Sequence, residues 1–432
     1  MLVLLLVILG GLMHAARTFS PAPGLGTTGG ATVLASGFLW LAGLFSGDLF
    51  KHIGFPRLTG YLIAGILAGP RVLDLVSDGM VVNLRIFNGA AIALIALTAG
   101  MELEFRFMRP LLRSVVSITL LAVLGTMVLL SGGIYLAGRF DLLPFTAKAT
   151  EIQLIAISLV LGVAMSAQSP AVVVALRKEM DADGPLTRTV LGVVVLADLA
   201  VILAFAFASS FAKAVYGVKA DALQTAGTLS WEILGSGVVG VLIGILVAAF
   251  LRNIRSDSGL FVVAVGFVVA EVGQRIQLDP LLIALAAGIF VRNATEVGDR
   301  LHDAIETASL PVYVAFFCVA GAAIHVDALL VVGLPALAFV LLRGCGFLGG
   351  AGVAAAIAGA PDVVRKYAGF GLLPQAGLAL ALALIFARTF PDFGEDAAAL
   401  IFAVVAINEM ISPVLYKMML ARSGEAGAAL RS

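Results

Sequence analysis

The sequence predicts an all-α polytopic membrane protein with about 13–14 transmembrane helices. Of its 432 residues, 61% are hydrophobic and 12% are charged, and the mean hydropathy is +1.09. A water-soluble domain of this composition would lack the polar surface needed to cover its core. Apolar stretches near the length of about 20 residues that a helix needs to cross a bilayer recur along the whole chain. The turns between them are short and polar, so we expect one membrane domain and no soluble domain.

The first apolar stretch, Met1 to about Leu12, is short for a span and has no basic leading region. It is either an extra span or a signal-like segment, and it falls in an N-terminal region of residues 1–30. Residues 31–422 form the predicted membrane domain, and residues 423–432 form a short tail. Within the domain every span must be helical, because lipid satisfies no backbone group. The predicted spans are 31–50, 57–70, 86–103, 113–138, 152–177, 187–211, 230–251, 259–273, 279–291, 307–323, 327–358, 364–388 and 396–419.

Basic residues are distributed unevenly when the loops are assigned alternately to the two sides of the membrane. Of the 27 Lys and Arg residues, 17 fall on one side and 9 on the other, with Arg343 inside a span. Cytoplasmic loops carry the excess of Lys and Arg. The bias therefore places the C-terminus in the cytoplasm, and it supports the number of spans, since one missed helix would remove it.

Asp198 lies about halfway along the predicted span 187–211, with no basic residue within a turn or two. A charged side chain inside a span costs several kcal/mol unless it is paired or reaches water, so it marks a candidate functional site. A carboxylate so placed must be protonated, bound to a cation or open to a cavity. Exchange of a proton for a metal cation requires such a group, because it holds either ion but not both. The alternative is a structural Asp that only makes hydrogen bonds.

Other charged residues in the spans allow less specific predictions. Arg343 lies in the middle of span 327–358, where it either pairs with a carboxylate or neutralises the negative ends of broken helices. Glu409 lies in span 396–419, and we expect it to pack between helices or to line a pathway. Glu271 and Glu102 lie near segment ends, where Glu271 is expected to be solvated and Glu102 can reach the headgroups.

Two predicted spans carry interruptions of the type that transporters use. One is the segment 162–170 in span 152–177, and the other is the segment 369–377 in span 364–388. Proline removes a backbone donor, and Gly, Ser and Gln let the chain unwind while they offer replacement hydrogen bonds. Unwound carbonyls and half-helix ends then bind ions at mid-membrane. The residues expected to form these breaks are Pro170, Pro374, Gln375 and Gly377.

Each interrupted span is the middle one of three consecutive spans. Matched triplets predict an inverted repeat whose broken helices cross beside Asp198 and Arg343. Two ordinary proline kinks are the alternative, and the intramembrane Asp and Arg next to the breaks favour the repeat. The triplets are 113–138, 152–177 and 187–211, and 327–358, 364–388 and 396–419.

The composition argues against several other classes. The net charge is zero and no basic run occurs, so nucleic acid is not an expected partner. Cys318 and Cys345 lie in apolar segments, where small buried hydrophobic residues are expected more often than a disulfide or a metal site. The four histidines have no ligand spacing. We therefore expect no enzyme, no cofactor and no metal other than a transported alkali cation.

Five motifs together resemble one family over residues 35 to 420. They are the Gly-x-x-x-x-Gly-x-x-x-Gly-Pro ending of segment 54–70, Gly-Met-Glu at 100–102, the break at 166–170, the stretch 184–198 that leads to Asp198, and Phe-Phe-x-x-x-Gly at 316–321. Each is weak alone, but the set is similar to the monovalent cation:proton antiporter superfamily. The resemblance is to its bacterial branch, with the Kef-type potassium efflux systems and the NapA-like sodium/proton antiporters.

The resemblance implies an inverted-repeat antiporter fold with two crossed broken helices, in a homodimer of the bacterial inner membrane. A core that includes 86–211 and 327–419 would move elevator-fashion against a rigid dimer domain. Asp198 would carry H⁺ or the cation, Na⁺ or K⁺, and Gln168 and Ser169 would offer oxygen ligands. Arg343 falls where members carry a Lys or Arg before the second broken helix. A separate regulatory subunit is compatible with this arrangement.

Three departures from the family pattern bear on mechanism. Ala197 stands where many members have a second acid or an Asn, and the breaks read Gln168-Ser-Pro and Pro374-Gln-Ala-Gly instead of Thr-Asp-Pro and Arg-Gly-Glu. With one carboxylate at the site, the simplest charge count is one cation per proton, which predicts electroneutral exchange. Two other functions stay open at this point. One is transport of an organic anion by the same fold, with Arg343 meeting the substrate, and the other is a membrane sensor that transports nothing.

Overall fold

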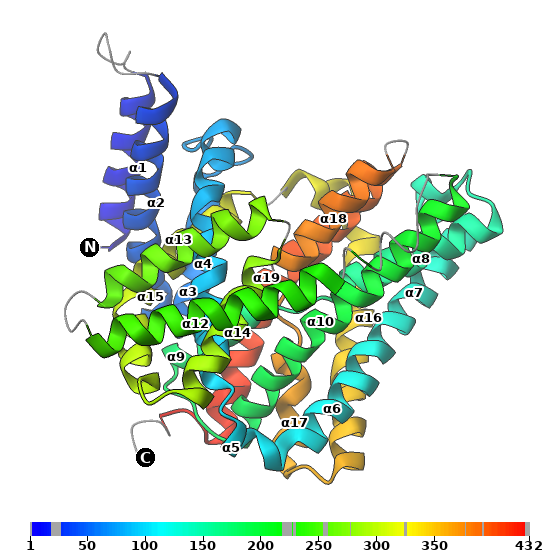
Figure 1. Ribbon diagram of the computed structural model, residues 1–432. Coiled ribbons are helices and arrows are strands. Elements are labelled where there is room, and N and C mark those ends of the chain that lie inside the picture. The colour runs from blue at the N-terminus through cyan, green and yellow to red at the C-terminus, as the bar shows by residue number, and fades with distance from the viewer. Residues whose placement is uncertain are drawn as a thin grey trace. The chain divides into compact units, whose positions relative to one another are not determined.

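The structure is a computed structural model, and the residues that it describes form helices and turns with no strand among them (Figure 1). Contacts divide the chain into two compact units, each built from two stretches of sequence. Unit 1 comprises Met1–Glu102 and Ile233–Ile324, and unit 2 comprises Leu103–Glu232 and His325–Ser432. The described residues are 2–18, 27–217, 227, 230–253, 258–276, 278–323, 326–375, 377–390 and 393–427.

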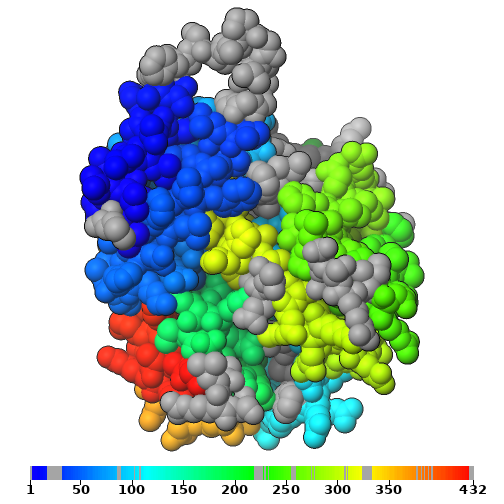
Figure 2. All heavy atoms as spheres, turned by 90° about the vertical axis from the view of Figure 1, so that its left-hand side faces the viewer, coloured from blue at the N-terminus to red at the C-terminus, as the bar shows by residue number. Residues whose placement is uncertain are grey.

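Unit 1 contains eight described α-helices, and the π-turn η4 (Trp231–Gly235) lies at the sequence boundary before its second stretch. Helices α1 and α2 lie side by side (Figures 1 and 2), α3 packs against α2 and α15, and α14 packs against α4 and α12. The helices are α1 (Leu2–Thr18), α2 (Thr27–His52), α3 (Arg57–Ala68), α4 (Asp78–Glu102), α12 (Ser236–Asn253), α13 (Ser258–Arg275), α14 (Pro280–Ala294) and α15 (Gly298–Ala322).

Two of the motifs found in the sequence meet where α3 packs against α15. A Cβ atom at Gly65 would collide with the carbonyl oxygen of Cys318, and a Cβ atom at Gly321 would collide with that of Leu62. Small residues let the backbones of membrane helices approach closely. The glycines of these two motifs therefore serve helix packing in unit 1.

Unit 2 contains both interrupted spans. Helix α16 packs against α6, α7, α17 and α19, and α8 packs against α7 and α10. The elements are α5 (Phe105–Met108), η1 (Arg109–Leu111), α6 (Leu112–Ile118), the π-turn η2 (Thr119–Val123), α7 (Leu124–Arg139), η3 (Pro144–Thr146), α8 (Glu151–Ser166), α9 (Pro170–Glu179), α10 (Pro185–Val215), α16 (Val326–Ala358), α17 (Asp362–Gly371), α18 (Gly377–Thr389) and α19 (Gly394–Ser423).

The predicted spans all have helical counterparts in the described chain. Seven helical segments are long and apolar enough to cross a membrane, or up to nine if each of two bent pairs is one span. Shorter apolar helices correspond to the first stretch, to spans 57–70, 259–273 and 279–291, and to the second half of span 364–388. The predicted all-α polytopic fold is therefore confirmed. Helix α1 is longer than the predicted first stretch, since it extends to Thr18.

Candidate functional site

The first break separates α8 from α9. Helix α8 ends at Ser166, residues 167–169 are not helical, and α9 begins at Pro170. Ser169 caps the new helix, because its Oγ accepts a hydrogen bond from the backbone N–H of Val172 at 3.4 Å, and proline suits the first helical position. Gln168 and Ser169 are 1% and 2% exposed. The sequence thus stops one half-helix and starts another deep inside unit 2.

The second break separates α17 from α18 and is tied to the first. Helix α17 ends at Gly371, residues 372–375 including Pro374 are not helical, and α18 begins at Gly377. The side chain of Gln375 is fully buried, and its Nε2 donates to the carbonyl of Met165 at 2.8 Å. Nδ2 of Asn408 in α19 donates to Oε1 of Gln375 at 3.0 Å. We call the two breaks, 167–169 and 372–375, the crossing.

Arg343 of α16 joins the two sides of the crossing. It is fully buried, and its guanidinium lies 4.6 Å from the ring centroid of Phe347. The guanidinium donates to four backbone carbonyls, two from each broken span. Its donor-to-acceptor distances are 2.9 Å to Met165, 2.8 Å to Ala167, 2.6 Å to Leu373 and 3.4 Å to Leu372.

The hydrogen bonds of Arg343 also place its positive charge at the C-terminal ends of two helices. The C-terminal end of a helix carries an effective charge of roughly −0.5, and both α8 and α17 end against Arg343. One guanidinium therefore compensates two half-helix ends and satisfies carbonyls that lost their helical donors. Of the two roles considered for Arg343 from the sequence, the described contacts correspond to the neutralisation of broken helices.

Asp198 lies in α10, the helix that packs against α8 and α17. Its side chain is 2% exposed. Ionising a carboxylate at such a depth is costly unless a cation or a network of donors compensates its charge. Gln168 supplies a further oxygen in the same unit, since its Nε2 donates to the carbonyl of Ser166 while its buried Oε1 has no hydrogen-bond partner in the described chain. Such oxygens are what an alkali cation needs.

The other acids from the sequence are placed differently. Glu409 of α19 is 1% exposed, and neither of its carboxylate oxygens has a hydrogen-bond partner within the described residues. Glu102 ends α4 in unit 1, and its side chain lies outside the described part of the chain. Glu271 is exposed and pairs with Arg275 at 2.6 Å, which agrees with the solvated position expected for it.

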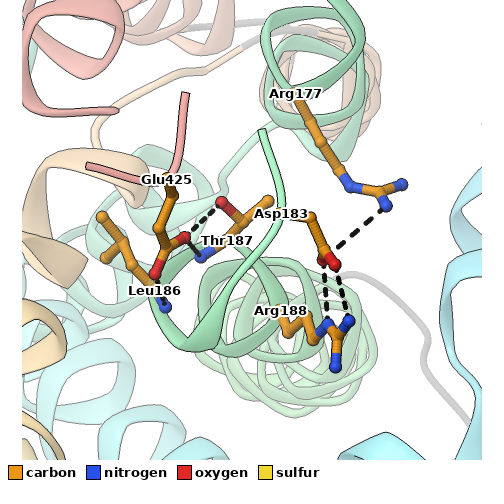
Figure 3. A network of polar contacts seen from close by, with 6 residues as sticks. All are labelled: Arg177, Asp183, Leu186, Thr187, Arg188 and Glu425. Carbon is orange, nitrogen blue, oxygen red and sulfur yellow. Dashed lines mark hydrogen bonds and ion pairs between the residues drawn. The ribbon is translucent and has the colours of Figure 1, made fainter. Parts of the chain in front are cut away.

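Sequence reasoning missed a second polar network in unit 2, around the start of α10 (Figure 3). The carboxylate of Glu425, in the tail, accepts from the backbone N–H groups of Leu186 and Thr187 at 2.6 and 2.8 Å and from Thr187 Oγ1 at 2.6 Å. Glu425 is 6% exposed. Backbone bonds from Asp183 N to the Glu425 carbonyl at 3.2 Å and from Gly427 N to the Met180 carbonyl at 2.9 Å complete the attachment.

Asp183 forms the other half of this network. It binds Arg188 through two hydrogen bonds of 2.9 and 2.6 Å and lies 4.0 Å from Arg177 (Figure 3). Burial raises the pKa of Asp183, but the hydrogen bonds and charge of Arg188 and the charge of Arg177 outweigh it and hold the pKa below its ordinary value. In Figure 2 the red end of α19 lies beside the green α9–α10 segment, consistent with the ion pair of Lys417 and Glu179 at 3.0 Å.

Comparison with known proteins places this site in a family. The family model described as "Sodium/hydrogen exchanger, transmembrane" matches residues 37–422. Among solved structures, the sodium proton antiporter MjNhaP1 from Methanocaldococcus jannaschii at pH 8 has a TM-score of 0.67 at 15% identity, covering 91% of this chain and 99% of that one. A second structure of MjNhaP1 has a TM-score of 0.70 at 15% identity, covering 92% of this chain and 97% of that one. This likeness shows the same fold.

A curated relative matches over a shorter region. The iron transporter MagA of Paramagnetospirillum magneticum is 26% identical over 167 residues, which is 38% of this chain and 34% of MagA. The matched region thus spans about a third of that relative. The family model, in contrast, extends over nearly the whole chain and includes both broken helices, Asp198 and Arg343. The chain belongs to the transmembrane sodium/hydrogen exchanger family.

Proposed function

We propose that this protein exchanges a monovalent cation, Na⁺ or K⁺, for H⁺ across a membrane, and that Asp198 carries both ions in turn. The observation that carries the proposal is the burial of Asp198 in a helix packed against both broken spans. A carboxylate at this depth is stable when it is protonated or when it binds a cation. Competition between the two ions for one group couples their movements.

The oxygens of the first break, in the helix pair that packs against the helix of Asp198, fit an alkali cation. Hard cations prefer carboxylate, carbonyl and amide oxygens. Gln168 offers the amide Oε1 that has no partner among the described protein groups, and Ser169 stands beside it in the non-helical stretch. Arg343 is a charge-balancing residue in this proposal, since its donors are already directed at backbone carbonyls.

The same contacts weaken the organic-anion alternative. A substrate anion would need donors from Arg343, but its Nε, Nη1 and Nη2 atoms all donate to carbonyls at or beside the crossing. Releasing them would leave buried carbonyls without donors, at a cost of about 1–3 kcal/mol each. We therefore favour the cation as cargo.

Several finer points of the proposal follow from one carrier carboxylate and two compact units. One cation replaces one proton, so exchange is electroneutral. The moving core of the elevator is unit 2, which holds both broken helices, and unit 1 is the static part of a homodimer. Residues 86–102 of the core that the resemblance implies belong to unit 1. The protein lies in the bacterial inner membrane with its C-terminus in the cytoplasm, because most basic loop residues fall on that side.

The test uses purified protein in liposomes that contain a pH-sensitive dye. After a proton gradient is imposed, Na⁺, K⁺, Li⁺, choline or Fe²⁺ is added, the last because MagA is an iron transporter. We expect Na⁺ or K⁺ to dissipate the gradient with wild-type protein but not with Asp198→Asn, which keeps the shape and removes the charge. Dissipation by the variant, or none by any alkali cation with the wild type, would refute the carrier role. A dependence of the rate on membrane potential would refute electroneutrality alone.

A further inference from the structure

A stripe of buried polar side chains runs along α19 from the crossing toward the end of the helix. Asn408, Glu409, Ser412 and Tyr416 are 5%, 1%, 1% and 0% exposed. Positions 409, 412 and 416 share one helix face, because residues three and four apart are neighbours. The stripe begins at the crossing, where Asn408 binds Gln375.

The other end of the stripe lies near the tail. Lys417, the residue after Tyr416, pairs with Glu179 of α9 at 3.0 Å, and the two side chains are 19% and 13% exposed. The buried polar residues along α19 are thus followed in the next position by a partly exposed ion pair. Pro413 lies inside the helix and has no N–H to donate to the carbonyl of residue 409. That carbonyl therefore lacks its usual helical donor.

Two groups of the stripe have polar atoms without a hydrogen-bond partner within the described residues. These atoms are the two carboxylate oxygens of Glu409 and the hydroxyl oxygen of Tyr416. Ser412, in contrast, donates to the carbonyl of Asn408 at 2.5 Å. Buried polar atoms that find no protein partner are ordinarily hydrated. A carboxyl group in such a place holds a proton that it can give up only to another acceptor.

Glu409 and Asp198 lie on helices that both pack against the broken spans, since α19 and α10 each contact α8 and α17. A Cβ atom at Gly371 would lie 2.8 Å from Cγ2 of Val190 in α10 and 2.9 Å from Cε2 of Tyr416 in α19, so these residues meet at one level. The tail after α19 caps the start of α10, so the two helices run in opposite directions. With a rise of about 1.5 Å per residue, Asp198 is about 12 Å along α10 from Val190, and Glu409 is about 10 Å along α19 from Tyr416, on the same side of this contact.

We propose that Glu409, with Tyr416 between it and the end of α19, is the group that delivers protons to Asp198 from that end of the helix. The inference rests on the proposed function. When the cation leaves, the proton of the Glu409 carboxyl moves to the Asp198 carboxylate, and the resulting Glu409 carboxylate takes up one proton along the stripe. One proton enters for each proton delivered, so Glu409 returns to its starting state and the exchange ratio is unchanged.

The test compares two activities of the same proteoliposomes. Cation-for-proton exchange needs the relay, whereas exchange of isotopically labelled for unlabelled cation at equal pH does not. We expect Glu409→Gln to slow cation-for-proton exchange about 10-fold or more, a modest part of what proton transfer by a positioned group contributes. Labelled-cation exchange and the cation KM should stay within about twofold of wild type. Equal loss of both activities, or loss of neither, would overturn the inference.

Further variants separate the relay from folding and from the proposed function. Glu409→Asp keeps an acid and should retain more cation-for-proton exchange than Glu409→Gln, while Tyr416→Phe should slow only that activity. The control is Glu271→Gln in unit 1, an exposed acid that should leave both activities unchanged. Equal cation-for-proton rates for Glu409→Asp and Glu409→Gln would contradict a relay. Wild-type protein that catalyses neither exchange would instead refute the proposed function, and the relay with it.

Discussion

Arg343 takes over hydrogen bonding that two broken helices lose. A helix that stops inside a protein leaves carbonyl groups without donors, and each buried one costs free energy. Met165 and Ala167 lie at the end of α8 and in the first break, Leu372 and Leu373 lie in the second break, and one guanidinium serves all four carbonyls. The arginine fork suits this task better than an ammonium group, because its donors point in fixed directions.

Replacing Arg343 should therefore destabilise unit 2 strongly. For Arg343→Met we expect a loss of several kcal/mol, because the buried carbonyls that it serves would each lose a donor at a cost of about 1–3 kcal/mol. Arg343→Lys keeps the charge but cannot reach both breaks at once. It should therefore lose some stability, but less than Arg343→Met. Thermal unfolding in detergent measures both variants. Equal stability of Arg343→Met and wild type would contradict the bracing role.

The sequence predicted some of these contacts and not others, for a physical reason. A charge or an interruption inside an apolar span is visible locally, which is how Asp198, Arg343, Pro170 and Gln375 were found. The choice of partner is not local. Asn408 binds Gln375 33 positions away, and Glu425 binds α10 across 238 and 239 positions. Neither residue breaks a local sequence rule, so no signal at its own position points to its partner.

At the scale of elements, each half-helix that ends at the crossing has a glycine in a tight contact. A Cβ atom at Gly162 in α8 would lie 2.6 Å from the backbone nitrogen of Ser131, and one at Gly369 in α17 would lie 2.7 Å from Cα of Leu348. The obstacles are backbone atoms, which cannot rotate away. These glycines set the approach of α8 to α7 and of α17 to α16.

Substitution of either glycine by alanine should separate the packed helices. We expect Gly162→Ala and Gly369→Ala each to cost about 1–3 kcal/mol, as overpacking of a filled interior does. Gly344→Ala in α16 is the matched control, because a Cβ atom there meets nothing within 4 Å, and alanine favours the helix by up to about 1 kcal/mol. The unfolding temperatures of Gly162→Ala and Gly369→Ala should fall, and that of Gly344→Ala should stay the same or rise. A loss in the control as large as in the other two would contradict the packing argument.

The start of α10 depends on an acid from the tail. Glu425 satisfies the N–H groups of Leu186 and Thr187 and places its negative charge at the positive end of the helix that carries Asp198. Glu425→Gln should lower stability by about 1 kcal/mol and raise amide hydrogen exchange at residues 186–188, measured by mass spectrometry. Glu395→Gln, at an exposed position in the first turn of α19, should change little. Unchanged exchange in Glu425→Gln would show that the tail does not hold the helix.

At the scale of the whole molecule, hydropathy predicted the spans, whereas the grouping of helices into two units depends on contacts between distant stretches. The boundaries fall after Glu102, Glu232 and Ile324, and those after Glu102 and Ile324 lie in sequence without a long polar linker. Inside lipid, every helix is apolar whether it faces a neighbour or the membrane, so hydropathy does not distinguish these surfaces. The periodicity that reveals a buried face in a water-soluble protein is therefore weak here.

The crossing makes a prediction about membrane topology. Helices α8 and α17 begin at different ends of unit 2 and end at the same residue, Arg343 (Figure 1). If unit 2 spans the membrane, Lys148 before α8 and Lys366 near the start of α17 must lie on opposite sides. Both side chains are exposed, and the excess of basic residues predicts that Lys366 is cytoplasmic.

Cysteine labelling tests this arrangement in intact cells. In a background with Cys318 and Cys345 changed to Ser, Lys148→Cys should react with a maleimide that does not cross membranes. Lys366→Cys should react only after the cells are permeabilised. Both variants should first be shown to retain wild-type activity, so that the labelled molecules are folded. Reaction of both cysteines from the outside would mean that α8 and α17 enter from one side, which is incompatible with two half-helices that meet end to end at Arg343.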